Sequence, residues 1–247
     1  MADCSGIFKE IADKIIQNEE KKPNYATEKC EDQYIGILQV GKFFPKFTKW
    51  IECSLVNPRD ERIRANLDKK IKKKRMPTIA IVIESPHKEE FSLNTPMPAV
   101  STTGENLFSF LPKYIIEAYL SIKMREKVCK GLKKKIIPAG KYRVCLINAI
   151  QYQCSLSVPT KTYRDEVFTQ MWKNNAVQND FKERLKGIEN LKIVINACTK
   201  GESQSVKLRV MVQEVIDEIL PNIKKFHSTH PCSWKETIKI EPDGWVK

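Results

Sequence analysis

The sequence contains few of the features that mark a membrane-bound, metal-rich or disulfide-stabilised protein. No apolar run approaches the roughly 20 residues needed to span a bilayer, and the N-terminus has no apolar core of the kind found in signal peptides. Histidine occurs only three times in 247 residues. None of the eight cysteines forms a CxxC pair, and Cys145 and Cys198 lie within apolar runs typical of strands. We therefore expect a monomeric cytoplasmic protein with reduced, structural thiols and no metal, cofactor or membrane partner.

The charge of the chain is strongly unbalanced. Its formal net charge is +13 at pH 7, which favours a polyanionic partner, and DNA is the partner we expect. The alternative is that lysine simply occupies solvated faces. The densest basic run, residues 69–75, could be a localisation tag or a phosphate-contacting segment, but we interpret it as a solvated approach to the first strand.

From residue 78 onward, apolar runs typical of strands alternate with segments of helical periodicity. This alternation predicts βαβ crossovers and a parallel sheet. The first run, Ile79 to Ile83, is continuous and β-branched, as in a strand buried on both faces. We predict a three-layer α/β/α sandwich with a central four-stranded parallel sheet. The expected strands are 78–84, 142–148, 191–196 and 224–228, and the expected helices are 104–122, 163–175, 180–186 and 203–220.

The first part of the chain shows helical spacing of apolar residues instead. Residues 5–20 predict a helix that ends before Pro23, and residues 31–71 are interpreted as further short helices. We therefore divide the chain into an N-terminal helical extension, 1–75, packed on a core domain, 76–247. Internal repeats and low-complexity tracts are absent.

Polar side chains follow three of the four predicted strands. Glu84, Ser85 and His87 come after the first, Asn148 ends the second, and His230 follows the fourth. Ligands of open α/β sheets bind at the carboxyl ends of strands, so these residues are candidates for one active site. The alternatives are a polar strand exit closed by Pro86, a turn-forming asparagine and a capping or buried histidine.

The order of these motifs resembles that of the uracil-DNA glycosylase superfamily. TIAIVIESPH is similar to the first motif, in which a strand runs into GQDPYH or, in family-four enzymes, GEAPG. RVCLINAIQYQ resembles the second motif, and HPCSW resembles the HPSPL or HPA loop. PAVSTTG, residues 98–104, resembles the family-four segment PFVGRAG. The resemblance covers roughly residues 78–235, and its strength lies in the order and spacing of four weak motifs.

The resemblance implies a role for each matching residue. Asn148 would hydrogen-bond the edge of a flipped base, and His230 would stabilise negative charge on the departing base. Trp234 would fill the gap left in the base stack. Glu84 matches the glutamate of GEAPG, whereas Ser85 replaces the aspartate that positions water. The water could therefore be held by Glu84, Ser85 or His87. Pro86 and Ala99 are expected in the base pocket, and Ser101, Thr102 and Ser233 are expected at the DNA.

Two departures from the family pattern modify this expectation. Trp50 and Cys53 stand at the spacing of the CxxC of family-four enzymes, and Tyr152 stands where a later ligand would fall, so we predict no iron–sulfur cluster. Ala99 replaces the phenylalanine that stacks on uracil, which removes a ring and opens space for a larger base.

These observations predict a monofunctional DNA glycosylase that excises a modified or bulky pyrimidine. One setting would be defence against phage with hypermodified DNA. A conventional uracil-DNA glycosylase in base excision repair is one alternative, and a catalytically silent relative that binds modified DNA is another. Ser85 in place of aspartate favours the silent relative, whereas Asn148 and His230 favour an enzyme.

Overall fold

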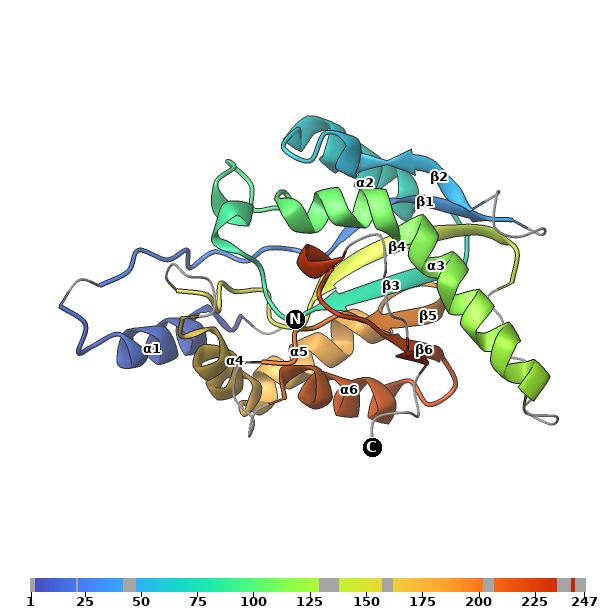
Figure 1. Ribbon diagram of the computed structural model, residues 1–247. Coiled ribbons are helices and arrows are strands. Elements are labelled where there is room, and N and C mark those ends of the chain that lie inside the picture. Colours follow the sequence, from blue (N-terminus) through green and yellow to red (C-terminus); the bar gives the residue numbers. More distant parts are fainter. Residues whose placement is uncertain are drawn as a thin grey trace.

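A mixed β-sheet with helices on both faces forms the centre of the molecule (Figure 1). The computed structural model describes residues 3–20, 22–41, 48–128, 138–156, 162–201, 207–234 and 241–242, with 116–128 and 241–242 described as backbone alone. Within this part of the chain the sheet has seven strands in the order β2-β1-β4-β3-β5-β6-β7. The strands are β1 (Gln33–Val40), β2 (Lys49–Cys53), β3 (Thr78–Ile83), β4 (Gly140–Asn148), β5 (Leu191–Asn196), β6 (Lys224–His227) and β7 (Glu241–Pro242).

The four strands predicted from the sequence are neighbours and run parallel to one another. β3 pairs with both β4 and β5, and β5 pairs with β6. All six residues of β3 are buried, as expected for a continuous β-branched run with helices on both faces. The carboxyl ends of these strands therefore lie at one edge of the sheet, and this edge carries the candidate residues.

The expected four-stranded sheet is incomplete, because strands that the sequence did not predict extend it at both edges. β1 runs antiparallel to β4, β2 runs antiparallel to β1, and β7 runs antiparallel to β6. The sequence predicts short helices in residues 31–71. The last of them is present as α2 (Glu61–Lys72), but Gln33–Val40 and Lys49–Cys53 are strands, so the expectation is wrong there. β1 is buried along nearly its whole length, and a Cβ on Gly36 would lie 2.5 Å from the carbonyl oxygen of Glu52 on β2. Close pairing of these two strands thus requires glycine at that position.

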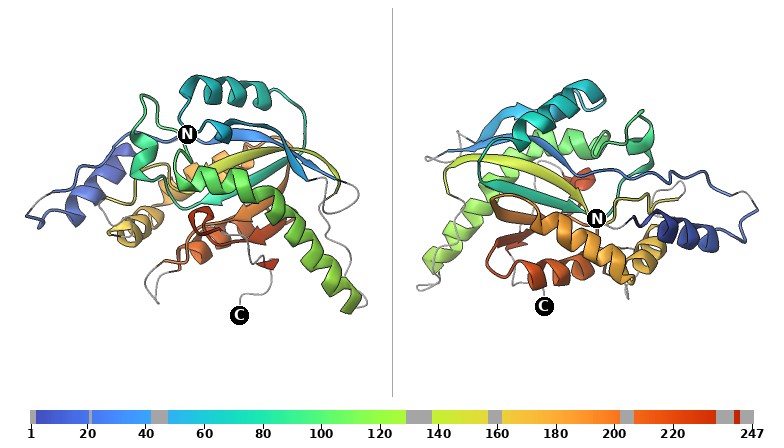
Figure 2. Two further views of the ribbon diagram at one scale, coloured as in Figure 1. Left: turned by 45° about the horizontal axis from the view of Figure 1, so that its top comes forward. Right: turned by 180° about the vertical axis from the view of Figure 1, so that it is seen from behind.

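Helices cover the two faces of the sheet (Figure 2). α3 packs on one face with a core that includes Leu107, Leu111 and Tyr114. α1, α4, α5 and α6 contribute to the core on the other face, and α2 packs against β1. Among the described residues, no helix is both long and apolar enough to cross a membrane. The helices are α1 (Ser5–Ile15), α2 (Glu61–Lys72), α3 (Thr102–Val128), α4 (Arg164–Trp172), α5 (Asn175–Lys186) and α6 (Leu208–Ile219), with short 3₁₀ helices η1 (Ser54–Val56), η2 (Lys88–Phe91) and η3 (Pro231–Ser233).

Candidate active site

A cavity of about 240 Å³ lies beyond the carboxyl ends of the parallel strands, between η2, the start of α3 and the loop after β6. Its lining includes residues from distant parts of the chain, and it brings together most of the residues singled out in the sequence. The predicted site residues that line the cavity are Glu84, Ser85, Pro86, His87, Ser101, Thr102 and His230.

Glu84 is held by the strands on either side of β3. Its carbonyl oxygen accepts a hydrogen bond of 3.0 Å from the N–H of Ile150, which follows β4. Its carboxylate oxygen Oε2 accepts a hydrogen bond of 3.0 Å from the N–H of Thr199, which follows β5. The side chain is buried. Glu84 is therefore fixed in position by backbone groups, as expected for a carboxylate with a specific task.

His230 faces Glu84 across the cavity lining. Nε2 of the ring lies 3.7 Å from Oε2 of Glu84, while Nδ1 accepts a hydrogen bond of 3.2 Å from the N–H of Cys232 at the start of η3. Burial alone would lower the pKa of His230, but the Glu84 carboxylate, together with Cys232 and Glu90, raises it to about 9. The Glu84 carboxylate therefore favours a positive charge on this ring. Nδ1 accepts a hydrogen bond in the arrangement described, so the charged form requires Nδ1 to release the N–H of Cys232.

His87 and Glu90 form a second polar pair in the same cavity. Nδ1 of His87 accepts a hydrogen bond of 3.3 Å from the N–H of Glu89. The Glu90 carboxylate accepts hydrogen bonds from the N–H groups of His87 and Ala99. Burial lowers the pKa of His87 and raises the pKa of Glu90 to about 7. The cavity thus holds two imidazoles whose pKa values are shifted in opposite directions, which is common at catalytic sites.

Sequence reasoning missed Glu90, although a signal was present. In His-Lys-Glu-Glu, residues 87–90, a polar residue is followed three positions later by glutamate, which is the pattern of a capping box. The structure contains that capping box. Sequence reasoning also missed other residues in the lining, and for these we find no local signal. They are Glu89, Thr103, Ser155, Arg164, Thr199 and Cys232.

Asn148 lies at the same edge of the sheet but does not line the cavity. It is fully buried. Its N–H lies 3.3 Å from Oδ1 of Asp32, and its carbonyl oxygen accepts a hydrogen bond of 3.0 Å from Arg184. Neither polar atom of its side-chain amide has a hydrogen-bond partner among the described residues. Buried amides are normally paired, so this one is available to a ligand that reaches it.

Trp234 and Ala99 do not line the cavity. Trp234 is 3% exposed and stacks on Tyr114, with ring centroids 4.8 Å apart, while its indole N–H donates to Ser228 and Thr229. It is a core residue and is not positioned to enter DNA. Ala99 is fully buried, and a side chain on Gly104 would overlap its carbonyl oxygen. Ala99 therefore closes the turn into α3 and does not form a wall of the cavity.

Ser233 stands apart from the cavity lining. It is exposed, and its hydroxyl donates to the carbonyl oxygen of His230 at 2.8 Å. Its contact with DNA stays a prediction. Among the described residues, no group of three or more histidine, cysteine or acidic side chains is arranged to hold a metal ion.

No family model, curated protein or solved structure matches this chain. The chemistry of the site must therefore be inferred from its own geometry. An imidazole that favours its charged form faces an anchored carboxylate, and neutral His87 and Ser85 lie in the same cavity. This set can stabilise a departing anion, stabilise a cation and orient water.

Proposed function

We propose that this protein is a DNA glycosylase that flips a nucleotide out of the duplex and hydrolyses its N-glycosidic bond. The products are a free base and an abasic site. The observation that carries the proposal is the pairing of His230 with Glu84, 3.7 Å apart in one cavity at the carboxyl ends of parallel strands. The fold that accompanies it, a three-layer sandwich of the uracil-DNA glycosylase type, is supported by the order of the sequence motifs along the parallel strands.

Each group has a role in a reaction that passes through an oxocarbenium-like state. Protonated His230 stabilises negative charge on the leaving base, and Glu84 both maintains that proton and opposes positive charge on the sugar. A water molecule supplies the new hydroxyl on the anomeric carbon, and the departing base takes up a proton. Neutral His87 and Ser85 are the candidates to orient that water.

Base recognition is the proposed task of Asn148. Its amide offers one donor pair and one acceptor, and both remain unpaired in the described part of the chain. Because the side chain is fully buried, a base could reach it only if the cavity deepens when the nucleotide enters.

DNA is the proposed partner, and a monomeric cytoplasmic enzyme remains the simplest setting. The net charge of +13 supports a polyanionic ligand. A modified pyrimidine remains the proposed substrate. Because Ala99 is buried, the space that its small side chain was expected to open in the base pocket no longer supports this proposal.

The test is incubation with duplexes that differ only in one base, including uracil, substituted pyrimidines and natural phage DNA. Alkali would then cleave the strand wherever a base has been removed. We expect cleavage at one class of base by the wild-type protein and its loss in His230→Ala. If tight binding occurs without cleavage of any duplex, the chain is a silent DNA-binding relative. Efficient cleavage at uracil alone would identify a conventional repair glycosylase.

A further inference from the structure

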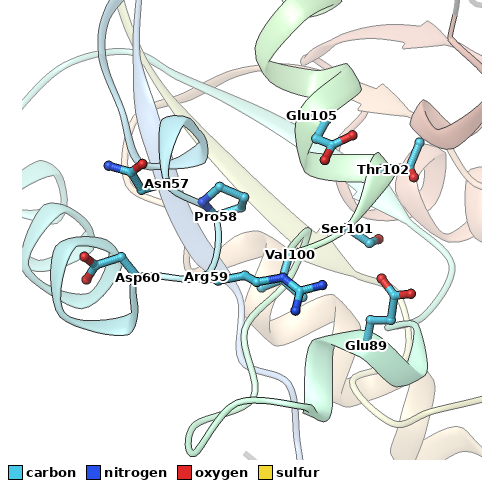
Figure 3. Close-up of a pocket in the computed structure, with 9 residues that line it drawn as sticks. All are labelled: Asn57, Pro58, Arg59, Asp60, Glu89, Val100, Ser101, Thr102 and Glu105. Carbon is cyan, nitrogen blue, oxygen red and sulfur yellow. The ribbon is translucent and has the colours of Figure 1, made fainter.

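A second cavity, more open to solvent, adjoins the reaction cavity. It measures about 390 Å³ and lies between the loop that leads into α2 and the start of α3 (Figure 3). The two cavities share Glu89, Ser101 and Thr102 in their linings, so they lie next to each other. The volume of the second cavity falls within the range of about 300–1,000 Å³ that is usual for ligand pockets.

The second cavity is lined mainly by side chains that make hydrogen bonds. Asn57 and Arg59 come from the loop before α2, and Ser101, Thr102 and Glu105 come from the start of α3. Figure 3 shows Arg59 extending from the α2 side toward the α3 side. Carboxylates, a guanidinium, an amide and hydroxyls together supply both donors and acceptors around a single space.

The charge of this lining argues against a phosphate. Arg59 is the single basic residue in the lining, where it is outnumbered by the carboxylates of Glu89 and Glu105. The third carboxylate, that of Asp60, instead accepts a hydrogen bond from the N–H of Ile63 at the start of α2. A phosphate group would meet a surplus of negative charge there. A neutral group with several hydroxyls would meet no such repulsion, because carboxylates accept hydrogen bonds from hydroxyls while Arg59 and Asn57 donate to hydroxyl oxygens.

We propose that the second cavity is a subsite for a neutral, hydroxyl-rich substituent, such as a hexose, carried by the base in the reaction cavity. The inference rests on the proposed function, because it is the excised base that carries this substituent into the site. It gives the modified-pyrimidine hypothesis a structural location that Ala99 does not provide. Glu89, Ser101 and Thr102 form the boundary between the two subsites.

The experiment compares two duplexes that differ in one group. In one, a cytosine carries a hydroxymethyl group, and in the other, glucose is attached to that hydroxyl. Affinity is measured in a His230→Ala background, in which the substrate is not consumed, and base release is measured with His230 intact. Asn57→Ala and Arg59→Ala test the subsite. Arg62→Ala is the matched control, because Arg62 is also exposed but lies outside the lining.

We expect the glucosylated duplex to bind about tenfold more tightly, since several new hydrogen bonds to charged groups would form. Asn57→Ala and Arg59→Ala should each remove most of that preference, and Arg62→Ala should retain it. Equal affinity for the two duplexes would overturn the subsite, as would an equal loss of affinity for both duplexes in the variants.

The two measurements separate this inference from the proposed function. A binding preference without release of any base would overturn the glycosylase while supporting the subsite. Base release without a preference for glucose would overturn the subsite alone. If neither is observed, both proposals fail.

Discussion

At the scale of single residues, two imidazoles in one cavity are driven toward different protonation states. Glu84 and its neighbours raise the pKa of His230 to about 9, whereas burial lowers the pKa of His87. These shifts favour the charged form of His230 and the neutral form of His87 at neutral pH. One site can thereby provide a cation that stabilises the leaving base and a neutral imidazole that orients the attacking water.

Replacing His230 with alanine should slow base excision by about 100-fold or more, because the charge that stabilises the transition state is lost. DNA affinity should stay within a few-fold of the wild type, since the ring would act mainly on the departing base. Single-turnover excision and equilibrium binding measure the two quantities. A parallel loss of rate and affinity would instead identify His230 as a structural residue.

Replacing Glu84 with glutamine should shift the alkaline limb of the pH–rate profile. The active form needs protonated His230, so wild-type kcat/KM should fall as pH rises through about 9. Glutamine removes the negative charge that raises this pKa, while burial continues to lower it. The limb should therefore move to lower pH, as measured by initial rates between pH 5 and 10. An unchanged limb would mean that another group titrates there.

At the scale of elements, Glu90 stabilises the segment between β3 and α3 through hydrogen bonds to its backbone. Its carboxylate accepts from the N–H of His87 at one end and of Ala99 at the other. Glu90→Ala should lower the free energy of unfolding by about 1–3 kcal/mol, since two backbone donors lose their acceptor. Urea denaturation measures this. Glu89→Ala is the matched control, because Glu89 is partly exposed. This variant should change the free energy of unfolding by less than about 0.5 kcal/mol.

Arg184 joins three elements through buried charge. It pairs with Asp180 within α5 and with Asp32 before β1, and it donates to the carbonyl oxygens of Asn148 and Ala149. Arg184→Met should reduce the free energy of unfolding by about 3–5 kcal/mol, because it leaves buried carboxylates without their partner.

The matched control for Arg184→Met is Lys182→Met on the same helix. Lys182 pairs with Glu218, whose side chain is 60% exposed, so its loss should cost less than about 1 kcal/mol. Thermal or urea unfolding of the two variants gives the comparison. Equal destabilisation would show that the buried network contributes no more than a surface ion pair.

The parallel strands could be predicted because their apolar runs are continuous, and their ends could be predicted because polar residues interrupt those runs abruptly. β1 could not be identified in this way. Tyr34, Ile37 and Leu38 have helical spacing, and only pairing with β4 and β2, which the sequence does not display, makes the segment a strand. Similarly, the position of both residues after parallel strands predicted that His230 would lie near Glu84, but the sequence could not show that Trp234 packs on Tyr114.

At the scale of the whole molecule, positive charge is spread well beyond the cavity. The basic run 69–75 leads into the amino end of β3, whereas the cavity lies past its carboxyl end. Within the run, Ile71 is buried, and Lys70 and Lys74 pair with Glu52 on β2. Lysines at the end of α2 also complement the helix dipole.

DNA binding should weaken steeply as salt is raised, because lysines and arginines displace condensed counterions from phosphates. Each phosphate neutralised contributes about −0.9 to the slope of log affinity against log salt for a duplex. Fluorescence anisotropy between low and physiological salt gives this slope. A value near zero would remove nucleic acid from the possible partners of this chain.

The pairing of β1 with β4 also has a consequence during protein synthesis. β1 is buried in the finished sheet, but the strand beside it emerges from the ribosome about a hundred residues later. At typical synthesis rates this delay lasts on the order of ten seconds. Throughout that time the edge of β1 that will pair with β4 has unpaired backbone N–H and C=O groups. Such an edge can pair with strands of other chains. The nascent chain is therefore most prone to aggregate before residue 148 appears, and chaperones that act during translation should raise its yield more than those that act after release.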